Sequence, residues 1–309
     1  MKTNKQSIDS AWQEMVFLLQ AETQRPSRVG EMREKIGVSM SFPGDRGILF
    51  HPTRQMDMSY AAGEFLWYLS GRNDLEVIQH YAPSYNRFAE DNGLLWGAYG
   101  YRWAIGGQLQ KLWKELIQSP DSRRAVLSMY DAAIDLNAQK RDIPCTLTLQ
   151  FLRRDGRIHL VANMRSNDIW LGFPYDVFVF TALQRMLAEL FDEQVGTYTH
   201  TVGSLHLYTK NEKKASQLAG QTNYPSLSFS RPNLRGEALA KALLRFEAKF
   251  RKEGYSLNGM VEVAAELGYF SFWTMLIGCA ALKNHTLTQD DRHCLSQGFI
   301  PTPVLGLLK

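Results

Sequence analysis

Cysteine is scarce in this sequence, and its scarcity excludes two kinds of protein. Three cysteines occur among the 309 residues, Cys145, Cys279 and Cys294, and their spacing matches no metal-binding motif. An odd number of widely separated cysteines does not form the disulfide framework that holds small secreted proteins together. We therefore expect no metal site, and we expect a reducing cytoplasmic setting.

Long hydrophobic runs and clusters of one charge are also missing. No stretch approaches the roughly 18 uninterrupted apolar residues of a membrane-spanning helix, and residues 1–15 lack the apolar core of a signal peptide. There is no block of Lys and Arg, and the net charge of +4 is spread along the chain. This mild excess suits a small anionic substrate as well as a polynucleotide, and most often it indicates no specific partner. We expect neither a membrane nor a nucleic acid as partner.

What remains is the composition of a globular protein with a large core. Hydrophobic residues make up 45% and charged residues 21% of a chain long enough for one large domain or two modest ones. Apolar residues at helical spacing predict helices over residues 8–22, 60–69, 108–117 and 177–191. Alternating or β-branched runs predict strands over residues 36–42, 125–130, 147–153, 158–164 and 197–208.

Two further segments shape the predicted organisation. Residues 82–103 are rich in aromatic residues, Gly and Asn, which predicts a long functional loop. From about residue 235 the pattern is helical again, with a stop at Gly254. We therefore expect an α+β fold, in which helices flank a mixed β-sheet. A catalytic domain over residues 1–234 would be followed by a helical C-terminal segment over 235–309, packed on that domain or extending it.

Cys145 is the first candidate for chemistry. It stands in Asp142-Ile143-Pro144-Cys145-Thr146, at the start of a predicted strand. A cysteine in such a place is most often a buried structural residue. It becomes a nucleophile only where cationic neighbours or hydrogen bonds lower the pKa of its thiol. The residues alone leave both interpretations open.

Several arginines are candidates for binding an anion. Arg165 and Ser166 lie in a polar run that follows an apolar strand, and this run is either a solvated loop or a phosphate site. The guanidinium group of arginine offers a planar fork of donors that matches a phosphate. Arg123 and Arg124 form a second such pair or an ordinary charged turn, and Arg28 gives a weaker third signal.

Glu64, His206 and Tyr208 complete the candidates. Glu64 lies within a strongly apolar predicted helix, where a carboxylate has to be paired, protonated or functional. His206 and Tyr208 point to one face of a predicted strand because they are two residues apart. They line a pocket or belong to the core.

The order and spacing of these candidates resemble the thymidylate synthase family from about residue 28 to residue 210. The resemblance includes Cys145 with Pro144, and the arginines Arg123 and Arg124 after Asp121-Ser122. The other matching words are Gly63-Glu64-Phe65-Leu66-Trp67, Tyr99-Gly100, Gln150-Phe151, Arg154-Asp155-Gly156, Arg165-Ser166 with Asp168, Leu171-Gly172-Phe173-Pro174-Tyr175 and His206-Leu207-Tyr208.

The resemblance implies a fold, a chemistry and a role for each matching residue. Cys145 would add to carbon 6 of a pyrimidine nucleotide, and carbon 5 would then take a one-carbon unit from 5,10-methylenetetrahydrofolate. Glu64 would position water and assist proton transfer, and Tyr99 would support proton removal from carbon 5. Phosphate would be held by Arg28, Arg165 and Ser166, with Arg123 and Arg124 from the second subunit of a homodimer. The sugar would contact His206 and Tyr208, and the folate would contact Asp168, Tyr85 and Gly172.

Asp176 is the most informative departure from thymidylate synthase, which has asparagine at this position. An asparagine amide complements the N–H and carbonyl of uracil, because it offers one acceptor and one donor. Cytosine reverses this pattern. A carboxyl group accepts from the cytosine amino group and shares a proton with ring nitrogen 3, so Asp176 predicts a cytosine base.

Other departures point in the same direction. Thr146, Met164, Asn167 and Ser204 resemble the phage deoxycytidylate hydroxymethylases. Tyr85 aligns with a tryptophan of thymidylate synthase, and its smaller ring would admit water. The last residues lack the short apolar ending that closes thymidylate synthase over its folate.

The sequence therefore predicts an enzyme, a folate-dependent hydroxymethyltransferase that converts dCMP or CMP to the 5-hydroxymethyl nucleotide. Ser166, Arg123 and Arg124 favour the deoxyribonucleotide. One alternative is a methylase like thymidylate synthase, or a hydroxymethylase that acts on dUMP. An alternative of another class is a relative without catalytic activity that binds nucleotide or RNA, which the retained Cys145 and Glu64 argue against.

Overall fold

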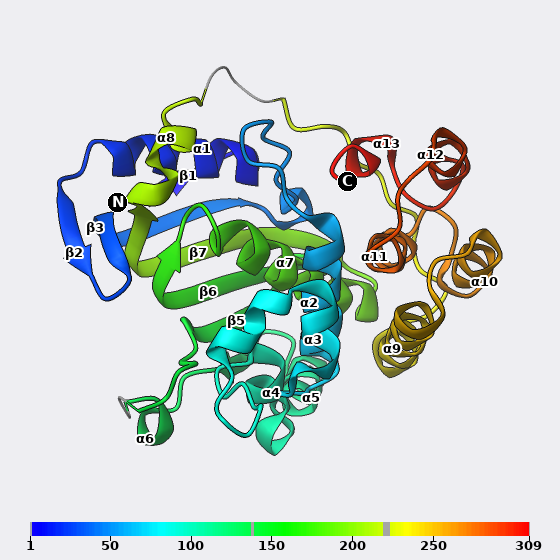
Figure 1. The fold of residues 1–309 in the computed structure, drawn as a ribbon. Coiled ribbons are helices and arrows are strands. Elements are labelled where there is room, and N and C mark those ends of the chain that lie inside the picture. Colours follow the sequence, from blue (N-terminus) through cyan, green and yellow to red (C-terminus); the bar gives the residue numbers. More distant parts are fainter. Residues whose placement is uncertain (1, 137–138, 219–222, 309) are drawn as a thin grey trace.

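A mixed β-sheet forms the framework of the protein in the computed structural model, which describes residues 2–136, 139–218 and 223–308 (Figure 1). The strands follow the order β1-β3-β7-β6-β5-β4, with β2 beside β3. Their bounds are β1 Lys2–Asn4, β2 Gln24–Ser27, β3 Gly30–Pro43, β4 Val126–Ser128, β5 Thr146–Arg154, β6 Arg157–Asp168 and β7 Gln194–Tyr208. The pairs β1–β3 and β6–β7 are parallel, and the other pairs are antiparallel. The predicted α+β class with a mixed sheet is confirmed.

The pairing of β6 with its neighbours brings two catalytic candidates together. The predicted hairpin at Arg154-Asp155-Gly156 is confirmed, and its register joins the start of β5 to the end of β6. As a result the backbone N–H of Arg165 donates to the carbonyl of Cys145 at 2.9 Å. On the other side of β6, Asp168 lies opposite His206 of β7.

Helices α1 (Ile8–Gln20) and α7 (Phe173–Leu190) pack against this sheet, and α2 (Met58–Leu69) packs on α7 (Figure 1). In α7 nearly every apolar side chain is buried, among them Val177, Phe178, Phe180, Leu183 and Leu187. Each such side chain contributes about 1.5–3 kcal/mol when it leaves water. This packing fixes the N-terminal turn of α7, which carries Asp176, against the sheet.

Residues 71–136 contain short helices rather than the long loop predicted over 82–103. The elements are α3 Leu75–Tyr81, η2 Pro83–Phe88, α4 Tyr99–Ala104, η3 Ile105–Gly107, α5 Gln108–Gln118 and α6 Ala132–Asp135. The prediction was wrong at both ends of that segment. Pro83 opens a helical turn, and the buried rings of Tyr99 and Trp103 hold a second one against α2.

The C-terminal helices pack against α2 and α7. Their bounds are α9 Gly236–Glu253, α10 Leu257–Leu267, α11 Phe272–Ala281, α12 Gln289–Ser296 and α13 Thr302–Leu305. The ring of Trp273 lies 5.8 Å from that of Phe65, and its indole N–H donates to Glu189 at 2.5 Å. This segment therefore supports the helix that carries Glu64. The boundary at residue 235 stays a prediction.

The remaining short elements are η1 Gly44–Arg46, η4 Thr209–Asn211 and α8 Glu212–Ala215. Over the described ranges, none of these helices is long and apolar enough to cross a membrane.

Candidate active site

A cavity of about 250 Å³ opens beside Cys145. Its walls come from α2, η2, the loop before α4, the segment before β5, β6 and the turn between β2 and β3. The polar side chains that line it include those of Arg28, Tyr85, Tyr99, Asp142, Cys145 and Arg165. Five of these six are residues that the sequence singled out, and the sixth is Asp142.

The thiol of Cys145 lies in the wall of this cavity next to a guanidinium group. Nη2 of Arg165 is 3.6 Å from Sγ of Cys145. Burial raises the pKa of the thiol to about 11, whereas Arg165 lowers it and the carboxyl groups of Asp176 and Asp142 raise it. The thiol is therefore protonated at neutral pH in the free protein. A nucleophilic role requires that bound substrate or a nearby base favours the thiolate.

Three arginines, Arg28, Arg141 and Arg165, line the cavity together with Lys140. Arg165 donates to the backbone carbonyls of Pro144 and Ile143, both at 3.0 Å, so that its guanidinium group is fixed beside Cys145. Arg28 lies on the exposed turn between β2 and β3 and lines the same cavity. Paired guanidinium groups at an open edge fit a phosphate group.

Glu64 lies behind one wall of the cavity, enclosed by three tyrosines. The hydroxyl groups of Tyr60 and Tyr85 each donate to Oε1 of Glu64 at 2.5 Å, and that of Tyr68 donates at 3.5 Å. Burial raises the pKa of Glu64, and these hydrogen bonds lower it. Because Tyr85 and Tyr68 also line the cavity, they connect Glu64 with its interior.

Asp176 is half-buried at the start of α7, where a chain of hydrogen bonds orients it. Nδ2 of Asn167 donates to Oδ2 of Asp176 at 2.7 Å, and Oδ1 of Asn167 lies 3.1 Å from Nε2 of His200. Burial lowers the pKa of His200 to about 3, so this imidazole is neutral. Its Nε2–H donates to Asn167, and its Nδ1 accepts from the hydroxyl of Tyr198 at 2.6 Å. The orientation of Asn167 is therefore fixed.

The consequence for Asp176 is a carboxyl group with a defined pattern of donor and acceptor. Burial and the charge of Glu64 raise the pKa of Asp176, and hydrogen bonds from Asn167 and Tyr99 lower it. The Asn167 N–H keeps Oδ2 an acceptor, so a neutral carboxyl carries its proton on Oδ1. Gly172 permits this contact, because a Cβ there would lie 3.1 Å from Nδ2 of Asn167 and 3.4 Å from Oδ2 of Asp176.

The other candidates near the sugar and folate positions lie at the ends of β6 and β7. The rings of His206 and Tyr208 are in contact, with centroids 4.9 Å apart. Asp168 accepts from the backbone N–H groups of Trp170 at 2.8 Å and Leu171 at 3.1 Å, and burial raises its pKa. Ser166 is half-buried opposite Ser204 and does not line the cavity.

Arg123 and Arg124 lie outside the cavity of this single chain. Both are exposed in the turn before β4, and the side chain of Arg124 is 83% exposed beside Glu115 at 3.3 Å. The structure therefore does not bring this pair to Cys145 within one subunit. Their position is compatible with a contribution to the site of a second chain.

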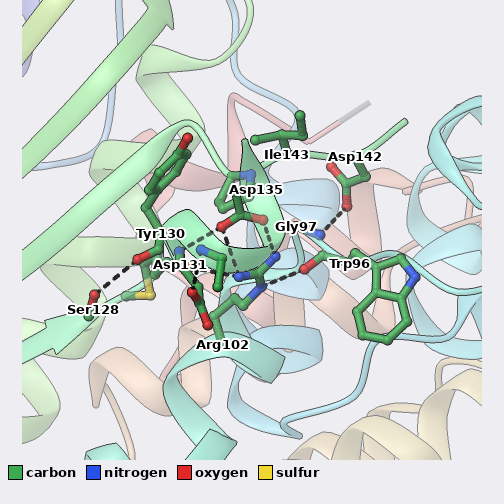
Figure 2. Close-up of polar contacts among 12 residues, drawn as sticks. Trp96, Gly97, Arg102, Ser128, Tyr130, Asp131, Asp135, Asp142 and Ile143 are labelled. Atoms are coloured by element: carbon green, nitrogen blue, oxygen red, sulfur yellow. Dashed lines mark hydrogen bonds and ion pairs between the residues drawn. The ribbon is translucent and has the colours of Figure 1, made fainter. Parts of the chain in front are cut away.

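An ion pair that the sequence did not reveal supports the loop before α4 (Figure 2). Arg102 and Asp135 form two hydrogen bonds, at 2.6 and 2.9 Å, and their side chains are 3% and 1% exposed. Nε of Arg102 also donates to the carbonyl of Trp96 at 2.6 Å. No local pattern marks these residues, because Arg102 lies on a six-residue helix and Asp135 lies 33 positions later.

The lining of the cavity fits a flat heteroaromatic ring such as that of a folate. Trp67, Tyr85 and Phe88 form one aromatic wall, with ring centroids 5.6 and 5.9 Å apart along the row. In the part of the chain that the structure describes, no group of three or more His, Cys, Asp or Glu side chains is placed to hold a metal ion.

Comparison with known proteins agrees with this arrangement. The family model described as thymidylate synthase matches residues 7–263. The deoxyuridylate hydroxymethyltransferase of Pseudomonas phage M6, a curated relative, is 30% identical over 244 residues. The match covers 76% of this chain and 69% of the relative.

Proposed function

The chain belongs to the thymidylate synthase family and is an enzyme of one-carbon transfer, and from this premise we propose that it hydroxymethylates carbon 5 of dCMP. The observation that carries the proposal is the half-buried carboxyl group of Asp176, which Asn167 orients through a hydrogen bond of 2.7 Å. The one-carbon donor of the family, 5,10-methylenetetrahydrofolate, supplies a methylene group to carbon 5 when it is bound.

The reading of the base rests on complementarity at the edge of the ring. Oδ2 of Asp176 accepts a hydrogen bond from the cytosine amino group, and the proton on Oδ1 is shared with ring nitrogen 3. This arrangement requires a neutral carboxyl before substrate binds, which the raised pKa of Asp176 supports. Protonation at ring nitrogen 3 draws electrons from carbon 6, so the attack of the Cys145 thiolate becomes easier.

The remaining residues bind the nucleotide and move protons. Arg28 and Arg165 hold the phosphate, and this places carbon 6 near Sγ of Cys145, because Nη2 of Arg165 lies 3.6 Å from that sulfur. His206 and Tyr208 hold the sugar 3′-hydroxyl. Tyr99, in the cavity wall, supports removal of the proton from carbon 5.

Three residues are assigned to the folate. Asp168, with Tyr85 and Gly172, is proposed to contact the pterin, where a carboxyl group complements ring N–H donors. Glu64 assists proton transfer through Tyr85 and Tyr68, the two hydroxyl groups that connect it with the cavity.

The active enzyme is proposed to be a homodimer. The exposed positions of Arg123 and Arg124 favour a contribution of this pair to the phosphate site of the other subunit. Ser166 lies next to Arg165 on β6 and is assigned to the same phosphate.

Hydroxymethylation of dUMP is a second candidate. The phage M6 relative is named for this substrate. A neutral carboxyl group at Asp176 matches uracil only when its proton lies on Oδ2, opposite the carbonyl at ring position 4, and Oδ1 accepts from the N–H at position 3. The two candidates differ only in the base, so the same experiment separates them.

The experiment is incubation of the purified protein with 5,10-methylenetetrahydrofolate and each of dCMP, CMP, dUMP and UMP. We expect dCMP to gain the mass of one CH2O unit, with the folate released as tetrahydrofolate. A gain of one CH2 unit together with the absorbance of dihydrofolate indicates methyl transfer and contradicts the proposal. Product from dUMP alone identifies the second candidate. Binding of RNA with a steep salt dependence, and no product, identifies a relative without catalytic activity.

A further inference from the structure

We propose that Asp142 is a further catalytic residue, the base that takes a proton from the water that becomes the new hydroxyl group. This inference rests on the proposed function and identifies the group that makes the product a hydroxymethyl nucleotide. It starts from a carboxyl group in the wall of the cavity, three positions before Cys145, for which the sequence predicted no role.

The position of Asp142 is fixed by one backbone hydrogen bond. Oδ2 accepts from the N–H of Gly97 at 2.9 Å (Figure 2). Gly97 is required for this approach, because a Cβ there would lie 2.7 Å from Oδ1 of Asp142. Among the described residues Oδ1 has no hydrogen-bond partner, and no Lys or Arg lies within ion-pair distance of the carboxyl group. One oxygen is therefore available to a water molecule.

The buried ion pair of Arg102 and Asp135 holds the donor of that hydrogen bond in place. Arg102 donates to the carbonyl of Trp96, the residue immediately before Gly97, at 2.6 Å (Figure 2). The same guanidinium group is fixed by two hydrogen bonds to Asp135. The N–H that orients Asp142 thus belongs to a loop with little freedom, as a preorganised site needs.

Asp142 is better placed than Glu64 to accept a proton from water. Oε1 of Glu64 already accepts from three tyrosine hydroxyl groups, and Tyr85 and Tyr68 stand between it and the cavity. Asp142 lines the cavity directly. The thiol of Cys145 lines the same cavity, and the charge of Asp142 raises the pKa of that thiol.

The ionisation of Asp142 suits this role. Burial raises its pKa to about 6, with the hydrogen bond from Gly97 and the charge of Arg102 lowering it and the charges of Glu90 and Asp135 raising it. Near neutral pH the carboxyl is mostly ionised, and it is a stronger base than an exposed aspartate. A general base is most effective when its pKa lies near the operating pH.

The step balances as follows. After loss of the carbon 5 proton and departure of tetrahydrofolate, the nucleotide carries an exocyclic methylene on carbon 5 and the Cys145 sulfur on carbon 6. The water oxygen bonds to the methylene carbon, and one water proton passes to Asp142. The π electrons of the exocyclic double bond move to carbon 5 and the ring. They then form the double bond between carbons 5 and 6, and the bond from carbon 6 to sulfur breaks to release the Cys145 thiolate.

The first test needs neither nucleotide nor folate. The rate of alkylation of Cys145 by iodoacetamide is measured against pH for the wild type, Asp142→Asn and the control Asp290→Asn, which is exposed on α12 and does not line the cavity. Removing the nearby negative charge favours the thiolate, so we expect Asp142→Asn to react about threefold faster or more at mildly alkaline pH. The control is expected to match the wild type. Equal rates for all three proteins overturn the placement of Asp142 beside the thiol.

The second test separates water addition from the earlier steps. With dCMP tritiated at carbon 5, tritium release reports methylene formation, and the hydroxymethyl nucleotide reports water addition. We expect Asp142→Asn to release tritium while product formation falls by about 100-fold or more, with a Cys145 adduct accumulating. Gly97→Ala keeps the carboxyl group of Asp142 but displaces it. We expect this variant also to release tritium faster than it forms the hydroxymethyl nucleotide, by a smaller factor than Asp142→Asn.

The outcomes distinguish this inference from the proposed function. If Asp142→Asn forms one product molecule per tritium released, as fast as the wild type, Asp142 is not the base. If it releases no tritium, Asp142 acts before water addition and the assignment is wrong. Failure of the wild type to convert dCMP or dUMP refutes the proposed function itself, and the alkylation result then stands alone.

Discussion

Replacement of Asp176 by asparagine tests which base the enzyme reads. The side chain is half-buried at the start of α7, and Asn167 donates to its Oδ2 at 2.7 Å. An amide has a fixed donor and a fixed acceptor and cannot transfer a proton to ring nitrogen 3 of cytosine. We expect the variant to lose efficiency with dCMP, because its amide cannot supply that proton, and this loss shifts the ratio of efficiencies toward dUMP.

The size of the change follows from the burial of the site. A mismatched buried hydrogen bond is unfavourable by about 1–3 kcal/mol, and two positions on the ring edge are affected. A net change of about 3 kcal/mol corresponds to roughly 150-fold in the ratio of kcat/KM for the two bases. Asn167 donates to the oxygen that becomes the carbonyl of the new amide and so keeps this amide in the orientation that suits cytosine. The full change is therefore expected in the double variant Asn167→Ser with Asp176→Asn, whose amide can turn its N–H toward the uracil carbonyl, and a smaller change is expected in the single variant.

The assay compares kcat/KM for dCMP and dUMP in the wild type and in both variants. Asp168→Asn serves as the control, because Asp168 is proposed to contact the folate rather than the base. This control is expected to lower both values of kcat/KM alike. A ratio that stays within about threefold of the wild type in Asp176→Asn would refute the reasoning, since it would mean that the carboxyl does not face the ring.

Three further predictions concern protonation and stability. The rate of alkylation of Cys145 in the free protein should be low at pH 7, rise about tenfold per pH unit and level off only near pH 11. A rate that levels off below pH 9 would show that the thiol is already activated. Asp9 is buried, its Oδ2 has no hydrogen-bond partner among the described residues, and burial raises its pKa to about 7. The folded state therefore binds this proton more tightly than the unfolded state does, and the free energy of unfolding falls as the pH rises from about 4 to about 7. Asp9→Asn should therefore stabilise the protein at pH 8, by up to about 4 kcal/mol in urea unfolding, and leave it unchanged near pH 3. Arg102→Met should destabilise it by about 3–5 kcal/mol, because Asp135 is left buried and charged, and the double variant with Asp135→Leu should recover part of that loss; additive losses would argue against a coupled pair.

Much of the fold was predictable from local patterns. The amphipathic spacing of residues 8–22 and the hairpin at Asp155-Gly156 each indicate one structure without reference to the rest of the chain, and both predictions are confirmed. The segment 82–103 was harder to predict, because its helical turns depend on contacts with α2. Tyr99 and Trp103 pack against Tyr68, a residue far away in the sequence.

The site was predictable where a residue type alone carries the chemistry. Cys145, Arg165 and Tyr99 line one cavity, as their resemblance to a known arrangement implied. The sequence did not reveal the groups that orient them. The chain from Tyr198 through His200 to Asn167 crosses from β7 to β6, and it exists only because these two strands pair.

Asp142 shows why a further candidate escaped notice. In the sequence it is one of many acidic residues in a polar stretch, and nothing distinguishes it from Asp131 or Asp155. Its significance comes from burial against the Gly97 N–H and from exposure to the cavity that contains the thiol. Both properties depend on the folding of the loop before α4.

The most direct test of the central claim is one competition reaction in water labelled with heavy oxygen. The wild-type enzyme is given equal amounts of dCMP and dUMP with 5,10-methylenetetrahydrofolate, and the products are weighed by mass spectrometry. The account predicts 5-hydroxymethyl-dCMP as the main product, with heavy oxygen in its new hydroxyl group. A methylated nucleotide, a product formed mainly from dUMP, or a hydroxymethyl group without the label would contradict it.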